Sequence, residues 1–198
     1  MITASMVKQL RDRTGAGMMD CKKALTECDG DLEKAIEVLR KKGASAVAKR
    51  ASRVAKEGVI ASYIHPGEKL GVLVEINCET DFVGRTEVFR TFARDIAMQV
   101  AAADPLVIRR EAIPEERLEK EKDVYRERAR NEGKPEQIIE RIVEGRLQKY
   151  YQEVCLLEQP FIKDPDRTIQ EVLTEISARL GEHIAIRRFA RFRLGEED

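Results

Sequence analysis

Residues 70–85 read LGVLVEINCETDFVGR, and this stretch decides how the larger part of the chain is built. Apolar residues alternate over its first seven positions, which is the pattern of a half-buried β-strand. The strand runs directly into Thr80-Asp81-Phe82, which places an acid beside an aromatic at a strand end. Such an end is a rigid place from which a side chain can project. Phe82 either projects to bind a partner or turns inward to cap the core, which is the commoner fate of phenylalanine.

The segments around this strand predict a small antiparallel sheet. Residues 58–64 alternate as well, and His65-Pro-Gly-Glu68 forms a turn signal between them and 69–78, so a hairpin is expected. Residues 183–194 alternate again, which predicts a closing strand beside the hairpin. Its apolar side chains fall on one face: Ile184, Ile186, Ala190, Phe192 and Leu194.

Helical spacing fills the gaps between these strands. Residues 86–103 and 167–180 each predict one helix. Residues 115–154 predict a charged helical hairpin that is broken at 131–135, where Gly133 ends one helix and a proline begins the next. Residues 56–198 are therefore expected to form an α+β domain, a small antiparallel sheet covered by helices.

Residues 1–55 predict a separate helical bundle with a linker helix. Its helical segments follow one another closely: 6–14, 18–28, 32–43 and 44–56. Thr3 or Ser5 is suited to cap the first helix, and Asp31 the third. Gly43 follows two lysines, as at a helix C-terminus, so the third helix is expected to end there. The last segment reads as a fourth helix or a helical linker.

Composition places the chain in a broad class. It has 198 residues, 36% charged and 42% apolar, which is typical of a globular protein. No apolar run approaches the roughly 20 residues of a membrane span, and the N-terminus lacks the pattern of a secretory signal. The four cysteines form no C-x-x-C pair, which favours reduced thiols and a cytoplasmic location. Net charge is zero, which argues against a dedicated nucleic-acid binder.

The residue types that covalent catalysis needs are sparse. His65 and His183 are the only histidines, and neither has a neighbour at metal-ligand spacing. Residues 14–17 (TGAG) lack the G-K-[ST] ending and the preceding strand of a phosphate-binding loop. We therefore expect no enzyme, no metal and no cofactor.

A binding surface is better supported. Met18 and Met19 are adjacent, so both cannot face the same core, and one of them is expected to be exposed. Flexible methionines suit a contact with a partner, although one can also fill a gap between helices. Arg11 lies close enough in sequence to frame such a patch.

Two stretches, 10–25 (LRDRTGAGMMDCKKAL) and 75–83 (EINCETDFV), resemble the two signatures of the elongation factor Ts family. Shorter segments are also similar to it: 131–135 (NEGKP), 156–161 (LLEQPF) and the basic strand 187–194. The likeness covers nearly the whole chain. Members of this family are the guanine-nucleotide exchange factors of elongation factor Tu in bacteria and organelles.

The resemblance implies a three-helix, ubiquitin-associated-like head and a partner, elongation factor Tu, in its GDP-bound and nucleotide-free states. It implies that Asp81 and Phe82, preceded by Thr80, act near the partner's magnesium site. It further implies that four residues of the head dock on the partner's G domain: Arg11, Met18, Met19 and Lys22.

This chain departs from the family in two respects. Gly84 stands where the family usually has serine or alanine, which could loosen the turn after Phe82. The chain also looks like a short member, without the second core subdomain and the long coiled coil of larger relatives. One such chain resembles half of the composite surface that contacts the partner. Whether the working unit is a homodimer formed through the sheet domain is therefore left open.

Two other functions are compatible with parts of the sequence. The helical head alone could serve as a binding module for ubiquitin-like folds or peptides, without exchange activity. The basic residues of the closing strand could instead serve an RNA-associated scaffold: Arg187, Arg188, Arg191 and Arg193. Strong salt dependence of RNA binding would favour the scaffold.

Overall fold

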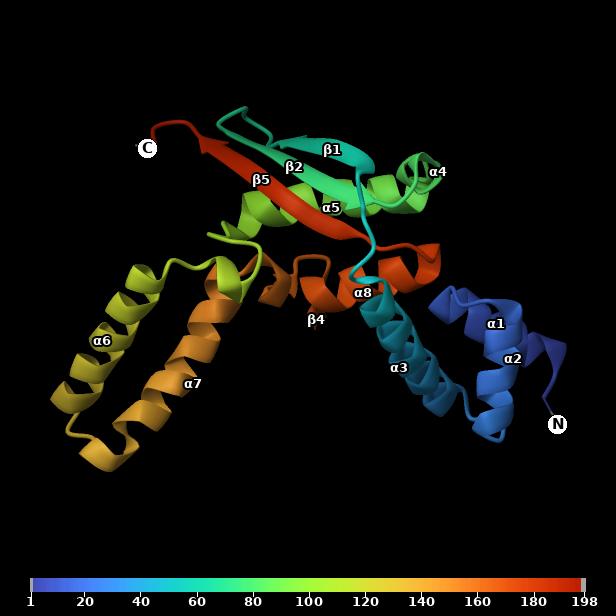
Figure 1. Ribbon diagram of the computed structural model, residues 1–198, viewed down its shortest axis with the longest axis horizontal. Coiled ribbons are helices and arrows are strands. Elements are labelled where there is room, and N and C mark those ends of the chain that lie inside the picture. The colour runs from blue at the N-terminus through green and yellow to red at the C-terminus, as the bar shows by residue number, and fades with distance from the viewer. Residues whose placement is uncertain (1, 197–198) are drawn as a thin grey trace. The chain divides into compact units, whose positions relative to one another are not determined.

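The computed structural model describes residues 2–196, and its elements follow in chain order in Figure 1. The helices are α1 (Ala4–Thr14), α2 (Met18–Glu27), α3 (Leu32–Arg50), α4 (Asp81–Gly84), α5 (Glu87–Ala103), α6 (Glu115–Asn131), α7 (Glu136–Val154) and α8 (Ile169–Leu180). The strands are β1 (Glu57–Ile64), β2 (Leu70–Cys78), β3 (Pro160–Phe161), β4 (Asp164–Thr168) and β5 (Ala185–Arg193). The predicted α+β class is confirmed.

The chain divides into two compact units. The first unit holds Met1–Val59, Ile76–Phe92 and Glu171–Ala185. The second unit holds Ile60–Glu75, Ala93–Gln170 and Ile186–Asp198. The predicted division into domains 1–55 and 56–198 stays a prediction, and residues 1, 197 and 198 of those ranges lie outside the described part.

Three helices form the N-terminal bundle of the first unit, as predicted. Helices α1, α2 and α3 share a buried cluster: Val7, Leu10, Cys21, Ala24, Leu25, Ala35 and Leu39. Thr3 caps α1, since its hydroxyl accepts a hydrogen bond from the Met6 amide. Asp31 caps α3 in the same way through the Lys34 amide at 3.1 Å. The sequence had predicted the Asp31 cap and had offered Thr3 as one of two candidates for the first helix, the other being Ser5, which lies inside α1.

The predicted end of the third helix at Gly43 is wrong, because α3 continues to Arg50. A Cβ atom built on Gly43 would lie only 3.2 Å from the Cβ of Ala178 on α8. Glycine therefore serves close packing between two helices of the first unit, and it does not terminate α3. The segment that was predicted as a fourth helix or a linker largely prolongs α3.

The main sheet has the strand order β1-β2-β5. A turn closes the hairpin of β1 and β2, where the His65 amide donates to the Leu70 carbonyl at 2.9 Å. Alternate residues of β2 are buried, namely Val72, Val74, Ile76 and Cys78, while Leu73 is exposed. The period of two in residues 70–78 thus predicted the strand and its buried face.

Only some of the alternating apolar side chains of the closing strand are buried. Ile184 and Ile186 are buried, whereas Phe192 and Leu194 are exposed. Arg191 keeps only 11% of its side chain exposed, and it pairs with Glu196 at 2.9 Å. Alternation therefore predicted the strand β5 but not which side chains are covered.

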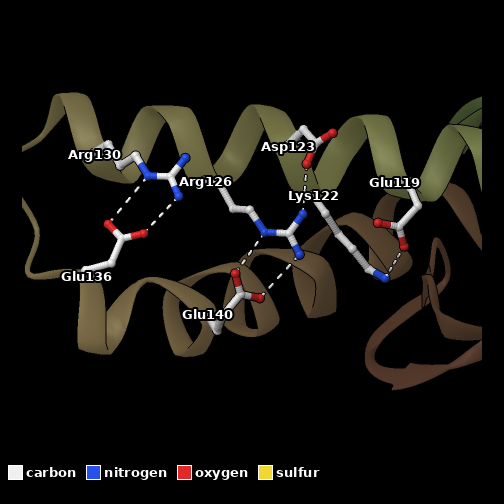
Figure 2. Close-up of polar contacts among 7 residues, drawn as sticks. All are labelled: Glu119, Lys122, Asp123, Arg126, Arg130, Glu136 and Glu140. Atoms are coloured by element: carbon white, nitrogen blue, oxygen red, sulfur yellow. Dashed lines mark hydrogen bonds and ion pairs between the residues drawn. The ribbon is translucent and has the colours of Figure 1, made fainter.

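Helices α6 and α7 form the predicted charged hairpin within the second unit. Apolar residues between them are buried, namely Ala129, Ile139, Val143, Leu147 and Tyr150. Figure 2 shows how ion pairs join the two helices, with Arg126 bound to Glu140 and Arg130 to Glu136, each at 2.8 Å. Gly133 adopts a φ of +70°, which suits glycine, and Pro135 precedes the first turn of α7.

A second ladder, β3 with β4, was not predicted. Its strands are short, and β4 begins Asp-Pro-Asp, a turn-like sequence without alternation. The neighbouring Gln99 stabilises it, since its side-chain carbonyl accepts a hydrogen bond from the Ile162 amide at 2.9 Å. The predicted start of the last helix near residue 167 is correspondingly two residues early, because β4 extends to Thr168. Over residues 2–196, every helix is too short or too polar to traverse a bilayer.

Candidate partner-binding site

Phe82 stands clear of the folded body at the end of β2. Its side chain is 86% exposed, the highest value among the exposed large apolar side chains of residues 2–196. It lies on α4, a single helical turn that follows the strand directly. The alternative that Phe82 turns inward and caps the core is therefore wrong. We call Thr80, Asp81 and Phe82 the tip.

Local hydrogen bonds hold the tip in place. The Thr80 hydroxyl accepts from the Val83 amide at 3.4 Å, and the Thr80 carbonyl accepts from the Gly84 amide at 3.2 Å. Beneath them the buried Cys78 thiol donates to the same carbonyl at 3.1 Å. Burial raises the pKa of the Cys78 thiol to about 11, so the thiol keeps the proton that it donates at neutral pH.

Asp81 is already engaged within the chain. Both of its carboxylate oxygens bind the Arg85 guanidinium, at 2.9 and 2.6 Å. The two side chains are largely exposed, and such a pair contributes at most about 1 kcal/mol. Sequence reasoning missed Arg85, although the i,i+4 spacing of an acid and a base was a visible signal.

A second missed residue lies far away in sequence. Glu182, in the loop between α8 and β5, directs its carboxylate at the strand end before the tip. It accepts hydrogen bonds from the amides of Glu79 and Thr80, each at 3.0 Å. No local pattern in the sequence indicates this contact, since more than a hundred residues separate its partners.

Gly84 is buried at the base of the tip, yet the space around it accepts a methyl group. A Cβ there would lie 3.6 Å from the Cys78 sulfur and 3.7 Å from the Gly58 carbonyl oxygen, both ordinary contacts. The glycine therefore does not serve close packing, unlike Gly43.

Gly84→Ala is expected to stabilise the chain by about 0.5–1 kcal/mol, because alanine lowers the entropy of the unfolded chain and suits a helix. Urea unfolding measures the change in midpoint. Gly145→Ala in α7 is a matched control, since a Cβ there meets nothing within 4 Å. A loss of stability for Gly84→Ala alone would show that the base of the tip is tighter than the structure indicates.

The four head residues lie on α1 and α2, and all of them are exposed: Arg11, Met18, Met19 and Lys22. Met18 is 56% exposed and Met19 76%, so both methionines face solvent, although only one had been expected to. The head residues and the tip both belong to the first unit.

Metal-ligating residue types do not gather in the described part of the chain. Residues 2–196 contain no group of three or more His, Cys, Asp or Glu side chains arranged to hold a metal. His183 uses its Nδ1 atom in a 2.8 Å contact with the Arg53 carbonyl oxygen. This contact joins the α8–β5 loop to the segment after α3, and the candidate site itself is a surface with the exposed Phe82 ring at its tip.

Comparison with known proteins identifies the family of this chain. Residues 3–196 match the model of the family described as Elongation factor TS. The chain is 63% identical to elongation factor Ts of Carboxydothermus hydrogenoformans, covering 99% of this chain and 90% of that relative. It is 60% identical to elongation factor Ts of Caldanaerobacter subterraneus, covering 99% and 98%. On this basis the chain belongs to the elongation factor Ts family.

Proposed function

We propose that this chain is a guanine-nucleotide exchange factor, which promotes GDP release from elongation factor Tu during translation elongation in the cytoplasm. The observation that carries the proposal is the exposed Phe82 ring on a hydrogen-bonded strand end. Membership of the elongation factor Ts family supports the choice of partner. The chain binds the partner in both its GDP-bound and nucleotide-free states, and it needs no membrane, nucleic acid or cofactor for this action.

Phe82 acts as a wedge near the partner's magnesium site. In a P-loop GTPase, Mg²⁺ bridges the phosphates and is held by a loop Ser or Thr and an Asp. Octahedral Mg²⁺ requires near-ideal geometry, so a small displacement of its ligands weakens it strongly. A ring inserted beside those ligands shifts them and loosens the metal and GDP together.

The energies involved are compatible with one wedge and several remote contacts. Accelerating GDP release about a thousandfold requires a barrier lower by about 4 kcal/mol. Burying one exposed aromatic side chain supplies about 1.5–3 kcal/mol. Coupling between the two binding sites is reciprocal, so this chain and the nucleotide weaken each other's binding to elongation factor Tu to the same extent. Binding of GTP can therefore release this chain from the complex.

Asp81 changes partners in the complex. Its carboxylate leaves the exposed ion pair with Arg85. It then accepts hydrogen bonds from donors in the segment of elongation factor Tu that the Phe82 ring displaces. Because that pair is weak, the exchange of partners costs little.

Mixing this chain with elongation factor Tu that carries fluorescent GDP tests the function directly. We expect the label to leave faster as the concentration of the chain rises, until the rate saturates. Release at the spontaneous rate over the whole concentration range would refute the proposal. Binding of elongation factor Tu that persists when the tip is removed, with GDP leaving only at the spontaneous rate even with the intact chain, would favour the helical binding module instead.

The head docks on the partner's G domain through Arg11, Met18, Met19 and Lys22. Met19→Ala is expected to weaken the nucleotide-free complex about tenfold, since it removes much of one exposed apolar side chain that the complex buries. Titration without nucleotide measures the change. Val54→Ala, which truncates a side chain that is 69% exposed after α3, is the control and should leave affinity unchanged. Equal losses for both variants would contradict a docking site on the head.

A homodimer is the second part of the proposal. The second unit exposes apolar residues around an open hollow on the main sheet, here called the sheet patch: Ile64, Leu73, Phe192 and Leu194. Large exposed apolar patches mark association surfaces, and a second copy offers a matching one.

Phe192→Asp is expected to turn a dimer into a monomer in sedimentation equilibrium, because it places a charge within the sheet patch. Leu106→Asp, at a side chain of the same unit that is 40% exposed, is the control and should leave the mass unchanged. A wild-type chain that sediments as a monomer at high concentration would refute the dimer.

The RNA-associated scaffold is less well supported by the contacts of the basic strand. Arg188 pairs with Glu75 at 2.7 Å, and Arg191 is largely covered. These two cations are therefore already engaged within the chain.

A further inference from the structure

Glu182 is unusual because one carboxylate serves three donors at the strand end. It accepts from the amides of Glu79 and Thr80 through Oε2, and from the Thr80 hydroxyl through Oε1 at 2.5 Å. All of these groups lie within the first unit. Hydrogen bonds to a charged acceptor are about twice as strong as neutral ones.

The contact is reciprocal. The Glu79 carboxylate accepts from the His183 amide at 2.6 Å and pairs with Arg53 at 3.3 Å. The hydrogen bond from His183, which outweighs the effect of burial, lowers the pKa of the Glu79 carboxyl. The strand end and the α8–β5 loop thus hold each other through two acids, Glu182 and Glu79, each of which accepts from backbone amides of the other segment.

The direction of the Thr80 hydroxyl follows from this arrangement. A hydroxyl has one proton, and a carboxylate can only accept, so Thr80 must donate that proton to Glu182. Its oxygen lone pairs are then left for the Val83 amide, which lies in the same helical turn as Phe82. The orientation of the cap therefore depends on an acid from a distant part of the chain.

We propose that Glu182 is a positioning residue for nucleotide exchange, which fixes Thr80 as the cap of α4 and so presents the Phe82 ring. This inference rests on the proposed exchange function. It assigns Glu182 an effect on the maximal rate of GDP release and not on the docking of the head.

Glu182→Gln tests the proposal with little change in shape. The amide oxygen can still accept from the Glu79 and Thr80 amides, but the NH₂ then faces the Thr80 hydroxyl and donates to it, which reverses that hydrogen bond and occupies a lone pair of the capping oxygen. We expect the maximal rate of GDP release to fall about tenfold, as for the loss of one charge-assisted hydrogen bond. The concentration of chain at half-maximal rate should stay within about twofold, because the head is untouched.

Two further measurements separate positioning from general support of the fold. Hydrogen exchange at the Thr80 and Val83 amides should quicken in Glu182→Gln, while the midpoint of thermal unfolding moves little. The matched control is Glu171→Gln, on α8 of the same unit, which removes the charge that pairs with Arg40. It should alter neither the release rate nor these amides.

A double-mutant cycle with Phe82→Ala decides whether Glu182 acts through the ring. If it does, Glu182→Gln has no further effect once Phe82 is removed. If Glu182→Gln lowers the rate of GDP release in the Phe82→Ala background as much as in the wild type, the proposal is overturned. It is also overturned if Phe82→Ala lowers the release rate while Glu182→Gln alone leaves the rate unchanged. If Phe82→Ala itself exchanges GDP like the wild type, the ring takes no part in exchange and the role of Glu182 fails, while the exchange function still stands; release at the spontaneous rate with the wild-type chain would instead refute the exchange function.

Discussion

Replacing Phe82 by alanine is expected to lower the maximal rate of GDP release from elongation factor Tu by about ten- to a hundredfold. Burial of the ring in the complex supplies about 1.5–3 kcal/mol, and each 1.36 kcal/mol is about tenfold in rate. The free chain should remain as stable as before, because the ring is 86% exposed and packs on little. Stopped-flow release of fluorescent GDP at saturating chain measures the rate.

Met19→Ala provides the contrast for this result. It should shift the concentration at half-maximal rate but leave the maximal rate close to that of the wild type, since Met19 contributes only to docking. Phe82→Ala should show the opposite pattern. A Phe82→Ala chain that reaches the wild-type maximal rate would remove the ring from the mechanism.

Gly58→Ala is expected to destabilise the chain by about 3 kcal/mol or more. Gly58, in β1, has a φ of +144°, and a Cβ there would lie 2.1 Å from the carbonyl oxygen of Ile76. Neither backbone can give way without breaking the contact between β1 and β2. The carbonyl of Gly58 also borders Gly84, so the damage reaches the base of the tip.

Gly67→Ala separates backbone strain from the clash. Gly67, in the turn between β1 and β2, also has a positive φ, +93°, but a Cβ there meets nothing within 4 Å. Urea unfolding should show a loss for Gly67→Ala that is clearly smaller than the loss for Gly58→Ala. Similar losses for the two variants would mean that the close approach of Gly58 to Ile76 is relieved at little cost.

The sequence predicted those elements whose signals are local. The period of two in residues 70–78 indicated both β2 and its buried face, and the break at 131–135 indicated the helical hairpin. Asp31 marked the start of α3 because a helix cap is read within a few residues. The sequence did not decide whether Phe82 is exposed, because phenylalanine side chains are buried more often than not.

The sequence could not show what depends on segments that are distant along the chain. Gly43 looked like a helix end, but its role depends on Ala178 of α8. The contact of Glu182 with Thr80 joins residues that no local pattern connects. The covered Arg191 and exposed Phe192 likewise depend on what packs against each part of β5.

The structure of this chain bound to nucleotide-free elongation factor Tu would test the central claim most directly. We predict that the Phe82 ring, open to solvent in the free chain, becomes buried in the partner beside the place where Mg²⁺ and the phosphates bind. In that complex the Asp81 carboxylate should accept hydrogen bonds from donors of elongation factor Tu and no longer pair with Arg85. A complex in which the ring still faces solvent, with the partner held only by the head, would contradict the account.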